Sequence, residues 1–183
     1  MNHLIEALRF YDFRVYFWMY ELGKNNHFWG SFFYFFALYG ILFFFASFIY
    51  LIWKTRINAL ICSFFAMGIA GLTDLAITLV WKRPRPFIAH ADVVNPDVSN
   101  LRVDFASFPS SHTYIAFAIA TSIYLYGHKK LGAILFILAI FVAISRVGMG
   151  LHYLSDIIGG ALLGVASGII AHQIVHKAEK NWQ

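Results

Sequence analysis

Long apolar stretches that alternate with short polar ones are the feature that most constrains how this chain can fold. Residues 31–53 contain no charged side chain, and residues 57–81 contain only Asp74. A helix that crosses the hydrocarbon core of a bilayer needs roughly 20 apolar residues, and both stretches are long enough. Further apolar runs cover residues 113–127, 131–147 and 154–175. The pattern predicts an all-α fold, a polytopic membrane helical bundle with about five spanning helices.

Composition supports this class of protein and excludes others. Of the 183 residues, 60% are hydrophobic and only 13% are charged, whereas soluble domains carry about 25% charged residues. The chain is short enough to form a single membrane-embedded domain over residues 1–183. Its formal net charge is +5, but the basic residues are scattered. Membrane lipids are therefore expected partners and nucleic acid is not, and no feature specifies an oligomeric state.

Residues 1–25 mix apolar and charged side chains. Apolar residues recur at helical spacing at Leu4, Leu8, Tyr11, Val15, Trp18 and Leu22. Charged residues interrupt them, so the segment favours an amphipathic helix that lies in the membrane interface. A sixth, weakly hydrophobic span is the alternative.

The positions of the basic residues predict how the chain is oriented in the membrane. One side of the predicted bundle carries Lys54, Arg56, Lys129, Lys130, Lys177 and Lys180. The positive-inside rule places that side in the cytoplasm. The other side carries the loop 82–111, whose basic residues we interpret as anion ligands. We therefore expect a multi-pass cell-membrane protein whose active-site loop, 82–111, faces the exterior or periplasm.

The segment between the last two apolar runs contains the residues best suited to chemistry. His152 and Asp156 are four residues apart, so on one helix they would share a face. The carboxylate would then accept a hydrogen bond from one imidazole nitrogen and leave the other as a nucleophile. Gly148 and Gly150 would break the helix and turn Arg146 toward the same place. This arrangement suits an anion that an arginine binds and a histidine attacks.

A second cluster, Phe108–His112, opens the third apolar run. The free amide groups of a helix N-terminus bind anions, so the backbone at Ser110, Ser111 and His112 could cradle a phosphate. Arg85, at the end of the second run, would join Arg146 in neutralising its charge. His112 would then be available as a general acid.

These clusters resemble the signature of the type 2 phosphatidic acid phosphatase family, whose pattern is Lys-x6-Arg-Pro, then Pro-Ser-Gly-His, then Ser-Arg-x5-His-x3-Asp. The third motif is complete from Ser145 to Asp156. The second has Ser111 where the family has glycine. The first ends in Arg85-Pro86 but has Thr78 at the lysine position.

Lys82 or Arg83 would replace the missing lysine, although we interpret both more readily as anchors for lipid headgroups. The surrounding residues, 77–90 and 107–113, are similar to the bacterial undecaprenyl-diphosphatase branch of the family.

The resemblance implies a metal-independent mechanism without a cofactor. His152 would attack phosphorus and form a phosphohistidine, Asp156 would orient its ring, and His112 would protonate the leaving oxygen and then activate water. The implied phosphate ligands are Arg85, Ser110, Ser111 and Arg146, with Lys82 and Thr78 as further candidates. No metal site is expected, because the loop acids Asp92, Asp97 and Asp104 are spread out.

The expected reaction is hydrolysis of undecaprenyl diphosphate to undecaprenyl phosphate and phosphate. Other polyprenyl or phospholipid substrates are open, namely phosphatidic acid, phosphatidylglycerophosphate or a lipid A phosphate. A non-catalytic lipid or anion transporter is a further alternative.

Several other residues have a structural and a functional interpretation. Asp74 lies inside a predicted span, four residues before Thr78 and on the same helical face. It either makes a structural hydrogen bond or supports the residues that form the site. His90 is either a loop residue without a role or a headgroup contact. Small residues at Gly159, Gly160, Gly164 and Gly168 predict close helix packing in the bundle.

Overall fold

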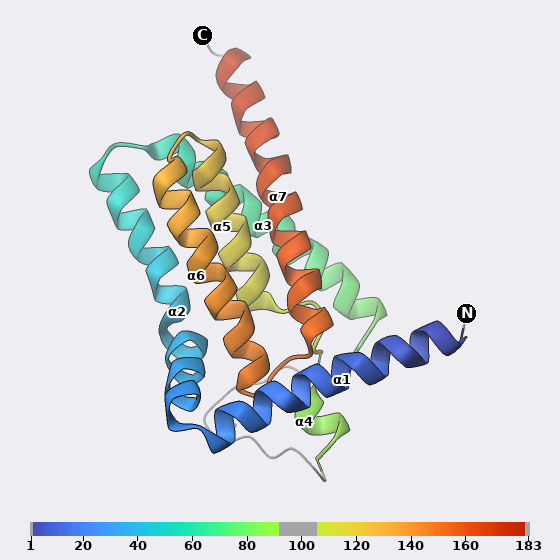
Figure 1. Ribbon diagram of the computed structural model, residues 1–183. Helices are drawn as coiled ribbons and strands as arrows, with labels where there is room; N and C mark the ends of the chain where they lie inside the picture. Colours follow the sequence, from blue (N-terminus) through green and yellow to red (C-terminus); the bar gives the residue numbers. More distant parts are fainter. Residues whose placement is uncertain (1, 92–105, 182–183) are drawn as a thin grey trace.

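The computed structural model describes residues 2–91 and 106–181, and every regular element in those ranges is a helix. The elements are α1 (Asn2–Asn25), α2 (His27–Trp53), α3 (Ile57–Val80), α4 (Pro86–Ala89), α5 (Ser111–Leu125), α6 (Lys129–Gly148) and α7 (Leu154–Asn181). Figure 1 shows α2, α3, α5, α6 and α7 running together as a bundle. The predicted all-α bundle is confirmed. The loop acids Asp92, Asp97 and Asp104 lie outside the described residues.

Four of the described helices are long and apolar enough to cross a membrane: α2, α3, α6 and α7. The fifth predicted span, α5, has 15 residues. At about 1.5 Å per residue it is roughly 22 Å long, which is less than the ~30 Å of a hydrocarbon core. It packs against α3, α6 and α7, so other helices enclose it. The chain is a multi-pass membrane protein, and in its described part four helices long enough to span surround a shorter central one.

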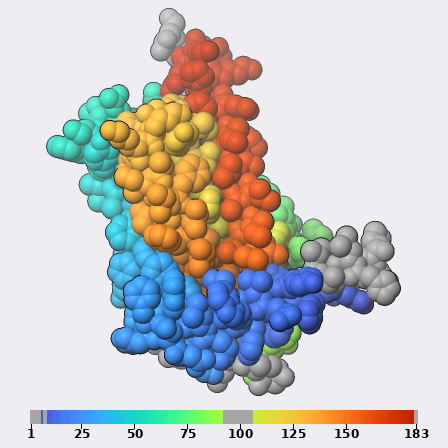
Figure 2. Space-filling view, in the orientation of Figure 1, coloured from blue at the N-terminus to red at the C-terminus, as the bar shows by residue number. Residues whose placement is uncertain are grey.

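Helix α1 lies across one end of the bundle instead of running along it (Figure 1). It is not among the helices apolar enough to span a membrane. Tyr16 is fully buried against the bundle, whereas Tyr11 and Trp18 on the other face are 63% and 65% exposed. Figure 2 shows its surface covering that end of the molecule. These features match the expected amphipathic helix, and its seat in a membrane interface stays a prediction.

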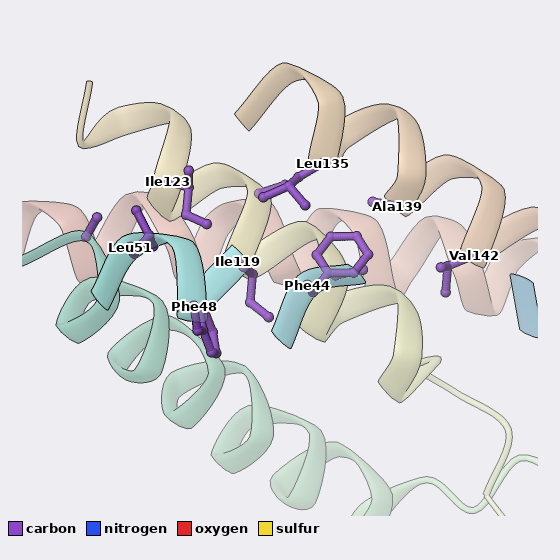
Figure 3. Packing of buried hydrophobic residues seen from close by; sticks show 11 residues of the cluster. Phe44, Phe48, Leu51, Ile119, Ile123, Leu135, Ala139 and Val142 are labelled. Atoms are coloured by element: carbon purple, nitrogen blue, oxygen red, sulfur yellow. The ribbon is translucent and has the colours of Figure 1, made fainter. Parts of the chain in front are cut away.

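The core of the bundle is formed by apolar side chains from α2, α5 and α6 (Figure 3). Phe44, Ile119 and Val142 are completely buried there. On the outer faces of the helices, large apolar residues remain exposed, for example Ile49, Leu72 and Leu162. Their exposure is expected where the surrounding solvent is lipid.

Glycines on α7 allow it to approach α5 closely. A Cβ atom on Gly164 would lie 2.5 Å from the carbonyl oxygen of Tyr114, and one on Gly168 would lie 2.6 Å from Thr121. The first of these atoms belongs to the backbone, and the second is the Cβ of Thr121, which is bonded directly to the backbone. Neither can move aside as the end of a flexible side chain can, so these positions tolerate only glycine. The predicted small-residue packing is confirmed, and it fixes the N-terminus of α5 against the start of α7.

We expect the substitution Gly164→Ala to destabilise the bundle, because the new methyl group would push α7 away from α5. Overpacking of this kind costs about 1–3 kcal/mol. Thermal unfolding in detergent measures the effect. Gly68→Ala is the matched control, since a Cβ atom there would meet nothing within 4 Å apart from the neighbouring backbone of its own helix. Equal melting temperatures for the two variants would contradict the packing described here.

Candidate active site

The three clusters predicted from the sequence meet at one end of the bundle, beside α1. They are the residue preceding α4, the N-terminal end of α5, and the turn between α6 and α7 (Figure 1). The Nη1 atom of Arg85 lies 3.1 Å from Nε2 of His152. The Nδ1 atom of His152 lies 2.8 Å from the carbonyl oxygen of Ser107. Segments that are far apart in the sequence therefore surround one imidazole ring.

His152 lies in the turn that precedes α7, and not on the same helix as Asp156. Helix α6 ends at Gly148 and α7 begins at Leu154, so the expectation of one shared helical face is wrong. Gly150 adopts φ +76° and makes the break, because a positive φ favours glycine. Gly148 has a packing role instead, since a Cβ there would lie 2.2 Å from the ring of Phe33.

The partners of His152 define which nitrogen carries its proton. A backbone carbonyl only accepts and a guanidinium only donates. Nδ1, against the carbonyl of Ser107, must therefore carry the hydrogen, and Nε2 must present its lone pair to Arg85. Burial lowers the pKa of His152 to about 4, so the ring is neutral near pH 7. The side chain thus has the form that a nitrogen nucleophile requires, and its lone pair faces a cation.

Asp156 is fully buried and organises this end of the molecule. Its carboxylate accepts hydrogen bonds from the Tyr153 amide at 2.9 Å and from the hydroxyl of Ser107. Its nearest approach to Nδ1 of His152 is 3.6 Å, so the direct hydrogen bond expected between them is replaced by the Ser107 carbonyl. Asp156 therefore orients His152 through Ser107 and also caps the start of α7.

Arg83 is not a lipid anchor. Its side chain is only 17% exposed, and its guanidinium forms ion pairs at 2.6 Å with both Asp156 and Asp12. The sequence patterns did not identify Asp12 and Ser107 as residues of the site. The one signal for Asp12 was its charge, which interrupts the apolar helical pattern of residues 1–25. Lys82 is exposed and lines a cavity of about 930 Å³ between α1 and the start of α7, so its role as a phosphate ligand stays a prediction.

Arg146 is a buried cation beside this ring. Its Nη1 donates to the carbonyl of Ala37 at 3.2 Å. Its Nε is buried and has no hydrogen-bond partner within the described part of the chain. The charges of Arg146 and Arg85 act on each other and on both His152 and His112. A buried cation is costly unless a counter-charge compensates it, so the pair of arginines makes this region receptive to an anion.

The N-terminus of α5 supplies amide donors next to the two arginines. Ser110 is the N-cap residue, and its own amide donates to the carbonyl of Asp156 at 3.1 Å. The Ser110 amide is therefore engaged with Asp156, and the role of Ser110 as a phosphate ligand stays a prediction. The first-turn amides of Ser111, His112 and Thr113 have no partner within the helix. His112 itself is half-buried in that turn.

Thr78 and Asp74 are engaged within the bundle. The hydroxyl of Thr78 donates to the backbone carbonyl of Asp74 at 2.9 Å, and its role toward substrate stays a prediction. The carboxylate of Asp74 accepts from the Tyr114 hydroxyl at 3.2 Å, which links α3 to α5 and favours the structural interpretation. His90 packs on Phe13 with ring centres 4.2 Å apart.

Comparison with known proteins agrees with the motifs. A family model described as the PAP2 superfamily matches residues 59–180. The chain is 37% identical over 105 residues to "Undecaprenyl-diphosphatase BcrC" of Bacillus subtilis (strain 168), a match that covers 56% of this chain and 51% of that protein. It is 31% identical over 172 residues to "Bacitracin transport permease protein BcrC" of Bacillus licheniformis, with 90% and 77% covered. The chain thus spans about half the length of the first relative and about three quarters of the second.

A solved structure also has this fold. "Crystal structure of Aquifex aeolicus LpxE" superimposes with a TM-score of 0.68 and 27% sequence identity, over 88% of this chain and 94% of that one. The resemblance noted from the motifs is confirmed at the level of family and fold.

We expect His152 to stay neutral well below the range where histidines normally titrate. Its pKa is about 4 in the folded protein, against ~6.5 in an unfolded chain. Between these values only the unfolded chain binds the proton, so folding stability is full above ~6.5 and falls as the pH drops toward 4. NMR of ¹⁵N-histidine-labelled protein in detergent measures the titration, and His152→Asn identifies the signal. A midpoint near 6.5 would contradict the buried, neutral ring.

Proposed function

Because the chain belongs to the PAP2 superfamily, we propose that this membrane-embedded lipid phosphatase hydrolyses undecaprenyl diphosphate to undecaprenyl phosphate and inorganic phosphate. The observation that carries the proposal is the lone pair of His152 Nε2, which faces the guanidinium of Arg85 at 3.1 Å. A relative named as an undecaprenyl-diphosphatase, 37% identical over 105 residues, supports the choice of lipid.

In the first chemical step, Nε2 of His152 attacks the terminal phosphorus of the diphosphate. A nitrogen–phosphorus bond forms, and the bond from phosphorus to the bridging oxygen breaks. This step requires the protonated form of His112, which burial and the two arginines disfavour in the empty site and which the negative charge of the bound diphosphate would favour. His112 gives a proton to that oxygen, so undecaprenyl phosphate leaves. Arg85 and Arg146 bind the terminal phosphate oxygens, whose charge shifts as the bond breaks.

In the second step, water attacks the phosphohistidine. His112, now neutral, takes a proton from the water while the nitrogen–phosphorus bond breaks. Inorganic phosphate leaves, and His152 regains its neutral form with the proton on Nδ1. Throughout, the carbonyl of Ser107 accepts the Nδ1 hydrogen bond, so the ring keeps its orientation.

The amides in the first turn of α5 complete the phosphate site. They add donors from the backbone of Ser111 and His112 and the positive end of the helix dipole. Lys82 and Thr78 are proposed as outer contacts for the headgroup. The positive-inside pattern supports an active site that faces the exterior or periplasm.

A transporter is the second candidate, because one relative is named a bacitracin transport permease. A carrier would bind phosphate with the same arginines but would not need a lone pair on His152. The neutral tautomer and the adjacent His112 favour the enzyme. Phosphatidic acid, phosphatidylglycerophosphate and lipid A remain the alternative substrates.

The test is phosphate release by the purified protein from undecaprenyl diphosphate and from the three alternative lipids. We expect the polyprenyl substrate to have the highest kcat/KM, and His152→Ala to lower kcat by roughly three orders of magnitude or more. His176→Ala is the matched control, because this exposed histidine lies near the other end of α7. Preference for a glycerolipid would overturn the substrate, and full activity of His152→Ala would overturn the mechanism.

We expect metal chelation to leave turnover unchanged, because the proposed nucleophile and both cationic ligands are side chains. Phosphate release after dialysis against EDTA measures this, with no metal added back. Loss of activity that a divalent cation restores would contradict the proposed chemistry.

A further inference from the structure

A network of charged side chains joins helix α1 to the carboxylate behind the nucleophile. The Nη2 atom of Arg83 donates to Asp12 on α1 at 2.6 Å. Its Nη1 atom donates to Asp156 and to the hydroxyl of Ser155, both at 2.6 Å. The planar fork of arginine suits this bridge between two carboxylates. The connection runs from helix α1 to the site itself.

Asp12 also acts on the start of α7. Its Oδ1 atom accepts from the amide of Ser155 at 2.9 Å, and its Oδ2 accepts from the Ser155 hydroxyl at 2.5 Å. The first amides of a helix lack intrahelical partners, so a carboxylate from another helix serves here as the cap. The residue after Ser155 is Asp156, so this cap fixes the backbone that carries the buried carboxylate.

These ion pairs are shielded from solvent. The side chains of Asp12, Arg83 and Asp156 are 10%, 17% and 0% exposed. Interactions between shielded charges are screened little by salt. The ion pairs therefore keep their strength in salt. Two carboxylates and one guanidinium leave one net negative charge on this network, next to His152.

We propose that Asp12 and Arg83 are positioning residues for phosphoryl transfer, acting through Ser155 and Asp156 on His152. The inference rests on the proposed function. Phosphorylation of Nε2 makes the imidazole ring cationic, since Nδ1 keeps its proton. Asp156 lies 3.6 Å from Nδ1 and stabilises that cation. Arg83 alone would neutralise Asp156, and Asp12 offsets Arg83 so that the negative charge remains available.

The other charged groups around His152 work in the opposite direction. Arg85 and Arg146 act on it as cations, and His112 lies on α5 within their field. A ring surrounded by these cations needs a compensating carboxylate when it becomes positive. The network from α1 supplies that compensation.

The test begins with Asp12→Asn, which keeps the shape of the side chain and removes its charge. We expect kcat on undecaprenyl diphosphate to fall about tenfold while KM stays unchanged, the low end of the loss seen when the hydrogen-bond partners that orient metal-bound histidines are replaced. Glu21→Gln is the matched control, because it removes one negative charge from a partly exposed site on the same helix. The control should retain the wild-type kcat.

A double-mutant cycle separates positioning from a general structural role. If Asp12 acts through Asp156, then Asp12→Asn should change single-turnover phosphate release by less than about twofold in an Asp156→Asn background. Thermal unfolding of each purified variant shows whether the loss of kcat accompanies a loss of stability. An undiminished tenfold loss in that background, or a wild-type kcat for Asp12→Asn, would overturn the proposal.

Arg83→Lys keeps the positive charge but lacks the fork that bridges the two carboxylates. If Asp12→Asn does not fold, Arg83→Lys replaces it in the cycle. We expect the same loss in kcat, and a wild-type kcat for Arg83→Lys would overturn the proposal. The wild type and His152→Ala are assayed alongside. Absence of hydrolysis by the wild type would remove the proposed function and this inference with it, whereas an active wild type with unaffected Asp12 and Arg83 variants would overturn this inference alone.

Discussion

A buried carboxylate, that of Asp156, holds the functional end of this protein together. An ionised group in an apolar interior is unfavourable unless hydrogen bonds and an opposite charge compensate it. Here the Ser107 hydroxyl, the Tyr153 amide and Arg83 provide both. Because these partners come from different segments, satisfying one charge brings together the connection before α5, the residues before α4 and the start of α7.

The bundle around this carboxylate gives it a rigid frame. The glycines of α7 bring α5 so close that the amide of Ser110 donates to the carbonyl of Asp156. The N-terminus of α5, proposed above as part of the phosphate site, and the turn that carries His152 are thereby fixed to each other. Catalysis by preorganised groups depends on such rigidity, since groups that need not reorganise stabilise charge most effectively.

Much of this arrangement is predictable from the sequence, because hydropathy and motif spacing are local properties. The apolar runs predicted the long helices, and the motifs predicted that Arg85, Arg146, His112 and His152 would gather. The details that failed depend on tertiary contacts. Helix α6 continues to Gly148 and the turn comes at Gly150, so His152 lies outside the helix. The Ser107 carbonyl replaces the carboxylate as the partner of Nδ1, and a backbone oxygen has no signature in sequence. The sequence around Arg83 is typical of a headgroup anchor, because its ion pair with Asp12 joins segments that are far apart in the sequence.

The ion pair between Arg83 and Asp12 also bears on how the protein is made. Residue 12 is synthesised before Asp156, which lies in α7, the last of the described helices. The network that links them can close only after the chain through α7 has been made. Until then the histidine that is synthesised just before that helix lacks its full surroundings. The candidate site is therefore assembled only once α7 has joined the helices made before it, and a chain that stops short of α7 would lack Asp156 and the network around it.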